Sequence, residues 1–362
     1  MAEDAGDRPL LRALEVARQG WGATHPNPMV GAVITEGGSV VAEGFHARAG
    51  EPHAEIMALR ALGRRPGAEA VLHVTLEPCS TQGRTPPCVQ AILDTGIRHV
   101  VVGTVDPNPL HAGRGLELLR AAGVEVRLAA GPVERACRQL NFLFNHWITR
   151  RRTLVALKVA RDATGRTVPR AGERWITGEA ARADVMRWRR LFPAIAVGAG
   201  TALADNPRLT ARLPSGEWCP IRLLLDRSGR TAGQSQLHLF SDAHRAQTVV
   251  ALDPRRVSPE RLAWFRALGV RLWEVASDNF LNAIVDRATA DGWLGLMVEP
   301  GPVLGQALLS AGLVDHGLVY TAPAGRADAT SPGWLAGNPP LLDPERVELG
   351  ADTLLAGSWL NR

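Results

Sequence analysis

Short apolar runs alternate with longer amphipathic segments through the first part of the chain. Short runs bounded by turn residues are typical of buried strands, and apolar positions three or four apart are typical of helices. The pattern predicts strands at residues 30–34, 40–44, 71–76, 100–104 and 124–128. It predicts helices near residues 10–19, 54–62, 88–95 and 113–122, and a last one over 132–145. Such alternation indicates an α/β domain.

A second domain is predicted after Arg150-Arg151-Arg152, where an apolar run at residues 154–160 starts a new strand. Three arginines at such a junction are typical of a solvated link, although a nucleic-acid patch would have the same residues. We place the boundary near residue 148, which gives a first domain over residues 1–148 and a second over 149–362.

Two strands of the second half end in glycines. The run at residues 194–197 leads into Gly198-Ala199-Gly200-Thr201, and the run at 294–299 leads through Gly301-Pro302 into a predicted helix over 303–311. The free amides and dipole of a helix start favour a pyrophosphate. An ordinary strand-to-helix turn has the same pattern, so the spacing alone leaves both interpretations open.

Composition and charge narrow the class of protein. A chain of 362 residues, 46% of them hydrophobic, is long enough to bury two cores. Its net charge of +5 suits anionic partners such as phosphorylated metabolites, nucleotides or nucleic acid without choosing among them. It contains no secretory signal and no apolar run of about 18 residues, so we expect a cytoplasmic protein with no membrane partner. Its four cysteines do not form a disulfide pattern.

Candidate chemistry lies in three segments of the first half, Pro52-His53-Ala54-Glu55, Pro78-Cys79 and Pro87-Cys88. One imidazole and two thiolates can hold zinc and leave its fourth tetrahedral position to water, whose proton Glu55 would move. Zinc deaminases carry a His-x-Glu element followed by Pro-Cys-x-x-Cys, whereas here eight residues separate the two cysteines. The residues therefore predict a hydrolytic zinc site with His53, Cys79 and Cys88 as ligands.

The spacing of these residues restricts where they can lie. Side chains two positions apart in mid-helix point in nearly opposite directions, so His53 and Glu55 fit one site only at the start of a helix. Cys88 is also expected at a helix start, which favours a thiolate. Two alternatives stay open: an exposed helix start with buried structural cysteines, or a closed structural zinc site with His73 or His99 as fourth ligand.

The first half contains a series of specific motifs: His25-Pro26-Asn27-Pro28, Gly44-Phe45-His46, the Glu55 and Cys79 segments, Gly83-Arg84-Thr85-Pro86-Pro87-Cys88, and Asp106-Pro107-Asn108-Pro109. In these motifs it resembles the bifunctional deaminase/reductase family of riboflavin biosynthesis. The eight-residue cysteine spacing is that of the family. The resemblance implies a cytidine-deaminase-like, three-layer α/β domain in which Asn27 and His46 hold the pyrimidine and Arg84 binds the substrate phosphate.

The second half is similar to the reductase half of that family, at Lys158-Val159-Ala160, Trp175-Ile176-Thr177, the segment from Val197 to Arg212, and the segment from Val298 to Leu304. This implies a dihydrofolate-reductase-like domain that uses NADPH. By the same resemblance, substrate contacts are expected at Arg189, Leu209, Arg212 and Glu299. The NADPH contacts are expected at Ala160, Trp175, Thr201, Asp205, Gly301, Pro302, Val303, Leu304, Gly305, Gln306 and Ala307.

Three positions of this half depart from the family pattern. Asp162-Ala163-Thr164 replaces Ser-Leu-Asp before Gly165, Arg174 stands where a substrate-binding serine is expected, and Arg227 replaces a small residue after Asp226. These changes add charge and bulk near the expected pocket. The sequence therefore supports deamination more strongly than reduction.

The resemblance implies two successive reactions that use zinc and NADPH. The first is hydrolytic deamination of 2,5-diamino-6-ribosylamino-4(3H)-pyrimidinone 5′-phosphate; the second reduces the ribosyl group of 5-amino-6-(5-phosphoribosylamino)uracil to ribityl. Two alternatives are a deaminase with a degenerate reductase domain and a nucleic-acid base deaminase. The latter is disfavoured because no basic groove with interleaved aromatic residues is visible. We expect a phosphorylated small-molecule substrate and no nucleic acid, and leave homo-oligomerisation open.

Overall fold

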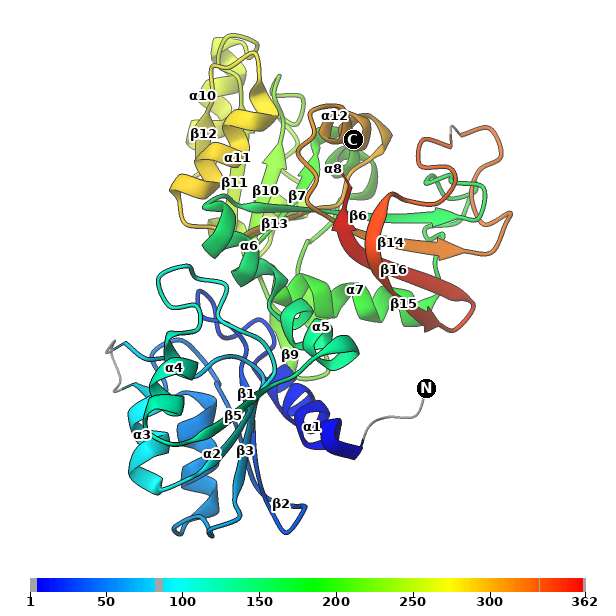
Figure 1. Cartoon of the computed structure of the whole chain (residues 1–362). Coiled ribbons are helices and arrows are strands. Elements are labelled where there is room, and N and C mark those ends of the chain that lie inside the picture. The colour runs from blue at the N-terminus through cyan, green and yellow to red at the C-terminus, as the bar shows by residue number, and fades with distance from the viewer. Residues whose placement is uncertain (1–4, 82–86, 332, 361–362) are drawn as a thin grey trace. The chain divides into compact units, whose positions relative to one another are not determined.

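The chain divides into two compact units, Met1–Arg151 and Arg152–Arg362. The computed structural model describes residues 5–81, 87–331 and 333–360. Each unit has a sheet of its own, with helices packed against it (Figure 1). No helix among these residues is long and apolar enough to cross a membrane.

The first unit has a five-stranded mixed sheet in the order β2-β1-β3-β4-β5. β1 pairs antiparallel with both of its neighbours, and β3, β4 and β5 run parallel. The strands are β1 (Gly31–Glu36), β2 (Ser39–Phe45), β3 (Val71–Val74), β4 (His99–Val102) and β5 (Glu125–Leu128). Because β3 and β4 are parallel, the segments that follow them emerge at the same edge of the sheet.

Helices cover both faces of this sheet and give a three-layer unit (Figure 1). On one face, apolar side chains of α2, α3 and α4 share a core with those of β1, β3 and β4. On the other face, α1 lies directly on β1, where a Cβ on Gly31 would be 2.0 Å from the Ala13 carbonyl oxygen. The helices are α1 (Arg8–Ala17), α2 (Ala54–Leu62), α3 (Cys88–Thr95), α4 (Arg114–Ala121), α5 (Gly131–Leu140) and α6 (Phe142–Arg150).

The helix predicted over residues 132–145 is wrong, because α5 and α6 are separate helices that meet at Asn141. The Asn141 side chain is buried and takes part in two hydrogen bonds with one residue of the loop before β1. Its Oδ1 accepts from the Met29 amide at 2.7 Å, and its Nδ2 donates to the Met29 carbonyl at 2.8 Å. This tertiary contact was not visible in the local helical periodicity.

The second unit has a nine-stranded sheet in the order β12-β11-β10-β7-β13-β6-β14-β16-β15. The strands from β12 to β14 are parallel, and β16 and β15 add an antiparallel pair at one edge. These strands are β6 (Leu154–Asp162), β7 (Ala194–Gly198), β10 (Ile221–Leu225), β11 (Thr248–Leu252), β12 (Arg271–Glu274), β13 (Gly295–Val298), β14 (His316–Ala322), β15 (Leu341–Leu349) and β16 (Asp352–Trp359). A small hairpin joins β8 (Ala211–Leu213) to β9 (Gly216–Trp218).

The order of the parallel strands places β13 between β7 and β6, although β13 comes well after both of them in the sequence. Ligands of open α/β sheets bind at the carboxyl ends of strands where the order switches in this way. At this edge β7 ends at Gly198, and Gly301 follows three residues after the end of β13. The helices of the unit are α7 (Glu179–Leu191), α8 (Ala199–Asp205), α9 (His238–Ser241), α10 (Pro259–Ala267), α11 (Phe280–Ala290) and α12 (Pro302–Ser310).

Candidate functional site

A group of metal-ligating side chains lies at the carboxyl edge of the first sheet. The ligand atoms of His53, Cys79 and Cys88 all lie within 4.8 Å of one another. His53 Nδ1 is 3.3 Å from Cys88 Sγ and 3.5 Å from Cys79 Sγ. The donor set and its spacing suit a zinc ion held by one nitrogen and two sulfurs.

Each of the three residues is held at the end of an element. His53 is the N-cap of α2, Cys88 is the first residue of α3, and Cys79 follows β3. The Cys88 amide donates to Cys79 Sγ at 3.3 Å, as expected of a helix start that faces a thiolate. The local fold therefore directs two helix starts toward one point.

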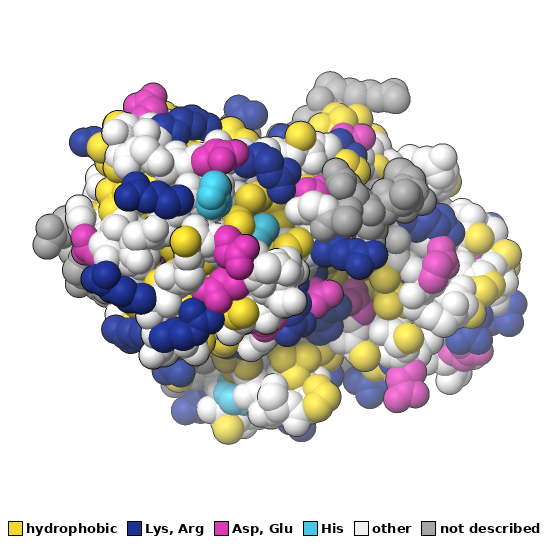
Figure 2. Space-filling model, turned by 60° about the horizontal axis from the view of Figure 1, so that its bottom comes forward, with side chains coloured by type: hydrophobic (Ala, Val, Ile, Leu, Met, Phe, Trp, Pro, Cys, Tyr) yellow, Lys and Arg dark blue, Asp and Glu magenta, His cyan; other side chains and the backbone are white. Residues whose placement is uncertain are grey.

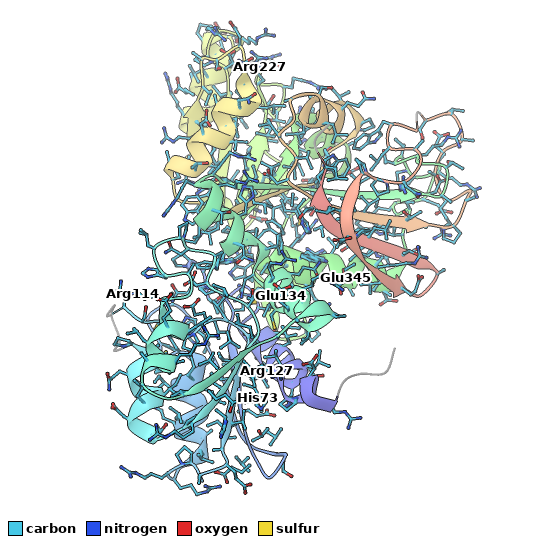
Figure 3. The ribbon with its side chains drawn as sticks, viewed as in Figure 1. His73, Arg114, Arg127, Glu134, Arg227 and Glu345 are labelled. Carbon is cyan, nitrogen blue, oxygen red and sulfur yellow. The ribbon has the colours of Figure 1, made fainter. Side chains whose placement is uncertain are left out.

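Neither histidine considered as a fourth ligand belongs to this group. His73 Nε2 is 3.1 Å from Thr35 Oγ1, and His99 pairs with Glu125 at 3.2 Å. Burial, with a smaller effect of Arg127, lowers the pKa of His73 to about 4; His73 and Arg127 are labelled in Figure 3. The described residues thus provide three ligands at this point, the number typical of a catalytic zinc site.

A bound cation would stabilise negative charge on the two sulfurs at this point. A hydrogen bond from Cys88 lowers the pKa of the Cys79 thiol, and the same bond, with burial, raises the pKa of the Cys88 thiol. A divalent ion would stabilise both as thiolates.

Glu55 lies in the first turn of α2 and is 3% exposed. Burial raises the pKa of its carboxyl to about 7. Its Oε2 is buried without a hydrogen-bond partner among the described residues. A buried carboxylate oxygen without a partner is costly, and it marks a position where a water or substrate group would bind.

Asn27 and His46 extend the group on the His53 side. The His46 ring lies edge-on to that of His53, with centroids 5.4 Å apart. Its Nδ1 is 3.1 Å from the Pro52 carbonyl oxygen, which can only accept, so Nδ1 carries the proton. His46 Nε2 then accepts from Asn27 Nδ2 at 3.1 Å. Arg84, the expected phosphate ligand, lies outside the described residues.

Glu77, which the sequence interpretation did not select, organises the neighbouring loop. Its Oε2 accepts from the amides of Asp106 at 3.1 Å and Gly113 at 2.9 Å, and its Oε1 accepts from the Gly115 amide at 2.8 Å. The carboxylate thus caps the start of α4 and ties the segment before Cys79 to the loop after β4. Its position between a buried strand and Pro-Cys was the only sequence signal.

In the second unit, Arg189 and Glu299 form a buried pair. Arg189 donates to both carboxylate oxygens of Glu299, at 2.7 and 3.0 Å, and to the Thr210 carbonyl at 3.0 Å. Burial alone would raise the pKa of Glu299, but Arg189 and Lys158 outweigh it and lower that pKa to about 2. Glu299 therefore stays ionised beside two cations.

Lys158 is a further residue that the site prediction omitted. Its Nζ lies 3.9 Å from Glu299 Oε2 and 5.8 Å from the centre of the Tyr320 ring. The sequence carried a signal that we did not use, because Lys158 is the single lysine among 41 lysine and arginine residues. Lys158 places a compact ammonium here, whereas the other positions counted as lysine or arginine are all arginine.

The structure places the remaining two expected substrate residues beside this pair. Arg212 Nη1 donates to Thr210 Oγ1 at 3.0 Å, which brings it to the residue whose carbonyl Arg189 contacts. Leu209 is fully buried and has a positive φ of 58°. It positions the turn that leads to Thr210 and Arg212.

The expected cofactor residues line the ends of β7, β13 and β6. A Cβ on Gly301 would lie 3.3 Å from Thr201 Oγ1, and one on Gly198 would lie 3.3 Å from Leu304, so the two glycine turns are adjacent. Gly301 is the N-cap of α12 and has no side-chain cap, which leaves its first amides available. These features fit a pyrophosphate, and hence a dinucleotide.

The other expected NADPH residues surround these turns. Residues 302–307 form the first turns of α12, with Val303 84% exposed. Asp205 ends α8, Ala160 lies in β6 opposite Tyr320, and Trp175 is 49% exposed before α7. Gly305 packs against Trp334 so closely that a Cβ there would lie 2.3 Å from the indole.

Two of the three departures from the family pattern are accommodated locally. The Asp162 carboxylate accepts from the Thr164 amide at 2.9 Å and from the Gly325 amide at 3.3 Å, so it holds loop backbone. The Arg174 guanidinium lies 5.1 Å from the centre of the Trp175 ring. Neither arrangement provides a reason for loss of reduction.

Comparison with known proteins supports the family resemblance of both halves of the chain. Residues 7–104 match the family described as the cytidine and deoxycytidylate deaminase zinc-binding region, and residues 155–326 match the RibD C-terminal domain. The riboflavin biosynthesis protein RibD of Actinobacillus pleuropneumoniae is 40% identical over 319 residues, which cover 87% of this chain and 82% of that protein. The RibD of Escherichia coli K12 is 36% identical over 370 residues, with 96% and 97% coverage.

Several solved structures match almost the whole chain. RibD of Acinetobacter baumannii (form 1) superposes with a TM-score of 0.78 at 33% identity, covering 97% of this chain and 98% of that one. A diaminohydroxyphosphoribosylaminopyrimidine deaminase/5-amino-6-(5-phosphoribosylamino)uracil reductase of Thermotoga maritima superposes with a TM-score of 0.79 at 32% identity, with the same coverage.

The role of Glu77 can be tested by Glu77→Gln. The amide nitrogen of glutamine would face at least one backbone N–H that a carboxylate oxygen now accepts, and such a loss costs roughly 1–3 kcal/mol. We expect the free energy of unfolding of the zinc-loaded protein, measured by urea denaturation, to fall by that amount. Glu117→Gln, on the exposed side of α4, is the matched control and should change little. Equal effects of the two substitutions would contradict the role given to Glu77.

Proposed function

The chain belongs to the RibD family of bifunctional deaminase/reductases in riboflavin biosynthesis, and we propose that the residues described above divide its two reactions between its two units. The family resemblance seen in the sequence is confirmed, as is the fold class: a cytidine-deaminase-like unit and a dihydrofolate-reductase-like unit. The enzyme uses zinc in the first and NADPH in the second. These findings therefore favour a bifunctional enzyme over a deaminase with a degenerate second domain.

The first unit deaminates 2,5-diamino-6-ribosylamino-4(3H)-pyrimidinone 5′-phosphate. The observation that carries this assignment is the three-ligand group of His53, Cys79 and Cys88 beside the partnerless oxygen of Glu55. Zinc, when bound by these three residues, supplies an activated water at neutral pH. The protein has to place a proton carrier and a pyrimidine on opposite sides of that water.

Glu55 is the proton carrier in this proposal. Its Oε2 takes a proton from the attacking water and returns it to the amino nitrogen that leaves the ring as ammonia. A carboxyl whose pKa is raised by burial to about 7 can both accept and donate a proton near neutral pH. Because this oxygen has no partner among the described residues, the proton transfer breaks none of the hydrogen bonds seen there.

Asn27 and His46 orient the pyrimidine. The Pro52 carbonyl binds Nδ1 of His46 and Asn27 binds Nε2, so both nitrogens hold the ring in place. Burial lowers the pKa of His46, which favours the neutral ring. The Asn27 amide is held in turn by His46 and can present its oxygen to the base. Neutral hydrogen-bonding groups of this kind select a neutral ring without competing for the metal. Arg84 remains the proposed phosphate ligand.

The second unit reduces the ribosyl group of 5-amino-6-(5-phosphoribosylamino)uracil. NADPH supplies the hydride when bound at the glycine turns of β7 and β13. Arg189 holds the Glu299 carboxylate in place beside Lys158, and Arg212, bonded to Thr210, adds a further positive charge to this group. We assign Arg212 to the substrate phosphate, since its planar fork can donate two hydrogen bonds to phosphate oxygens.

The substrate is a small phosphorylated pyrimidine, and no nucleic acid is required. Figure 2 shows basic side chains mixed with acidic and neutral ones on the viewed face, whereas nucleic-acid binding favours a basic stripe. A cytoplasmic location is part of the proposal, because phosphorylated metabolites and NADPH are held there. Homo-oligomerisation stays a prediction.

Glu55→Gln tests the deamination mechanism. The substitution keeps the shape of the side chain but removes its ability to accept a proton. We expect zinc content to stay at the wild-type value while ammonia release falls by about a thousandfold or more, within the range of a lost acid–base group. Reductase activity on the deaminated intermediate is the internal control and should be retained. Near-normal ammonia release would remove Glu55 from the mechanism.

Arg212→Ala tests the assignment in the second unit. Loss of a charge-assisted contact to phosphate costs about 1.5–3 kcal/mol, so we expect kcat/KM for reduction to fall by roughly ten- to a hundredfold. The decrease in absorbance of NADPH at about 340 nm measures it. Ammonia release should be unchanged. If Arg212→Ala left kcat/KM for reduction unchanged, another residue would bind the phosphate.

A further inference from the structure

A buried tyrosine joins β14 to α7 beside the Arg189 and Glu299 pair. The Tyr320 side chain is 0% exposed, and its hydroxyl donates to Asp184 Oδ2 at 2.8 Å. Burial, and after it the charge of Asp184, raises the pKa of the Tyr320 phenol, so the hydroxyl stays protonated and can donate. Both the ring and the hydroxyl of Tyr320 are therefore held in place.

The acceptor of this bond is itself fixed within α7. Asp184 is 8% exposed, and its Oδ2 also accepts from Trp188 Nε1 at 3.0 Å. Its Oδ1 accepts from Arg187 Nη1 at 3.1 Å. Three donors thus satisfy a carboxylate whose burial would otherwise be costly. Asp184 therefore sets the direction of the Tyr320 ring.

α7 is joined to the strands on either side of β6. Asp184 binds Tyr320 of β14, and Arg189, five residues further along α7, binds Glu299 directly after β13. β6 lies between β13 and β14 in the sheet and carries Lys158. The two contacts of α7 therefore flank the position of Lys158.

The Tyr320 ring lies next to the Lys158 ammonium. Lys158 and Ala160 lie on the same face of β6, and Ala160 is paired with Tyr320. Lys158 Nζ is 5.8 Å from the centre of the ring, within the range of a cation–π contact. Its ion-pair partner, Glu299 Oε2, is 3.9 Å away, which is too far for a hydrogen bond. The ring is thus a second source of stabilisation for this cation.

Lys158 needs this stabilisation because it is buried. Burial lowers the pKa of its ammonium; Glu299 opposes this effect, Arg189 adds to it, and Asp205 opposes it. These charged groups come from the end of β13, from α7 and from α8, and Tyr320 covers the side toward β14. The face of an aromatic ring attracts a desolvated cation, and a phenol that donates to a carboxylate has a more electron-rich ring.

We propose that Tyr320, held by Asp184, is a positioning residue for reduction: its ring stabilises and orients the Lys158 ammonium beside Glu299. The proposal rests on the reductase function above, because Lys158 and Glu299 must face the substrate of that reaction. Tyr320 itself touches neither substrate nor NADPH and acts through Lys158. Loss of the ring would increase the neutral fraction of Lys158 and leave its side chain free to move.

The test is a direct titration of Lys158 by NMR. Because Lys158 is the single lysine of the chain, zinc-loaded full-length protein with ¹³C-labelled lysine gives a side-chain signal that reports this residue alone. In Tyr320→Leu we expect the acid dissociation constant of Lys158 to rise about two- to thirtyfold, the effect of one lost cation–π contact. Tyr320→Phe keeps the ring but loses the bond to Asp184, so it should give a smaller rise.

A second modification weakens the ring without changing its size. Tyr320 is the single tyrosine, so biosynthetic incorporation of 3-fluorotyrosine withdraws electrons from this ring alone. We expect the dissociation constant of Lys158 to rise here too, which decides the matter even if Tyr320→Leu fails to fold. An unchanged constant in both Tyr320→Phe and the fluorinated protein would overturn the proposal.

Phe240→Leu is the matched control for loss of a buried ring. Phe240 is 1% exposed on α9 and packs against Trp264 and Phe265. Its substitution should lower the free energy of unfolding without changing the titration of Lys158. An equal change of the Lys158 constant in Phe240→Leu and Tyr320→Leu would make the effect a general loss of packing, and the proposal would be wrong.

The pH dependence of reduction connects the contact to the reaction. In each Tyr320 variant, kcat/KM followed by NADPH absorbance at about 340 nm should decline at a lower pH than in the wild type, in step with the Lys158 constant. A pH profile that stays in place while the constant changes would overturn the role in reduction. If the wild-type chain reduced nothing, the reductase function would fail, whereas the NMR titration would still measure the Tyr320 contact.

Discussion

The first unit depends on a concentration of buried acidic groups that one divalent cation can stabilise. Two thiols, an imidazole and the Glu55 carboxyl meet at a point where burial opposes the negative charge of each acidic group. Without a cation, burial favours the protonated forms of Cys88 and Glu55. A divalent cation would stabilise the ionised forms of all three acidic groups, which links its binding to the chemistry of deamination.

Backbone geometry places these groups within reach of one another. α2 and α3 begin at this edge of the sheet, and the segment that contains Cys79 leaves β3 there. Glu77 joins that segment to the loop after β4 through three backbone amides. The second unit uses the same principle, because strand ends carry its charged groups and glycine turns leave space for a cofactor. In both units, rigid parallel strands position groups that lie far apart in the sequence.

Much of this could be predicted because the signals are local. His53, Glu55, Cys79 and Cys88 have a spacing that only a few chemistries require, and the two fold classes follow from strand and helix periodicity together with the family motifs. The break at Asn141 could not be predicted, since it depends on a hydrogen-bonded contact with Met29, which is distant in sequence. Glu77 was not recognised for the same reason: the backbone amides that it binds belong to another loop. Lys158 differs, because its uniqueness was visible in the composition.

The most direct test of the account is the zinc coordination of the purified enzyme, determined by X-ray absorption at the zinc edge. The account predicts one ion per chain with two sulfur neighbours at about 2.3 Å and two nitrogen or oxygen neighbours at about 2.0 Å, one of them an imidazole and the other exchangeable solvent. Fewer than two sulfur neighbours, or a second protein nitrogen in place of solvent, would contradict it.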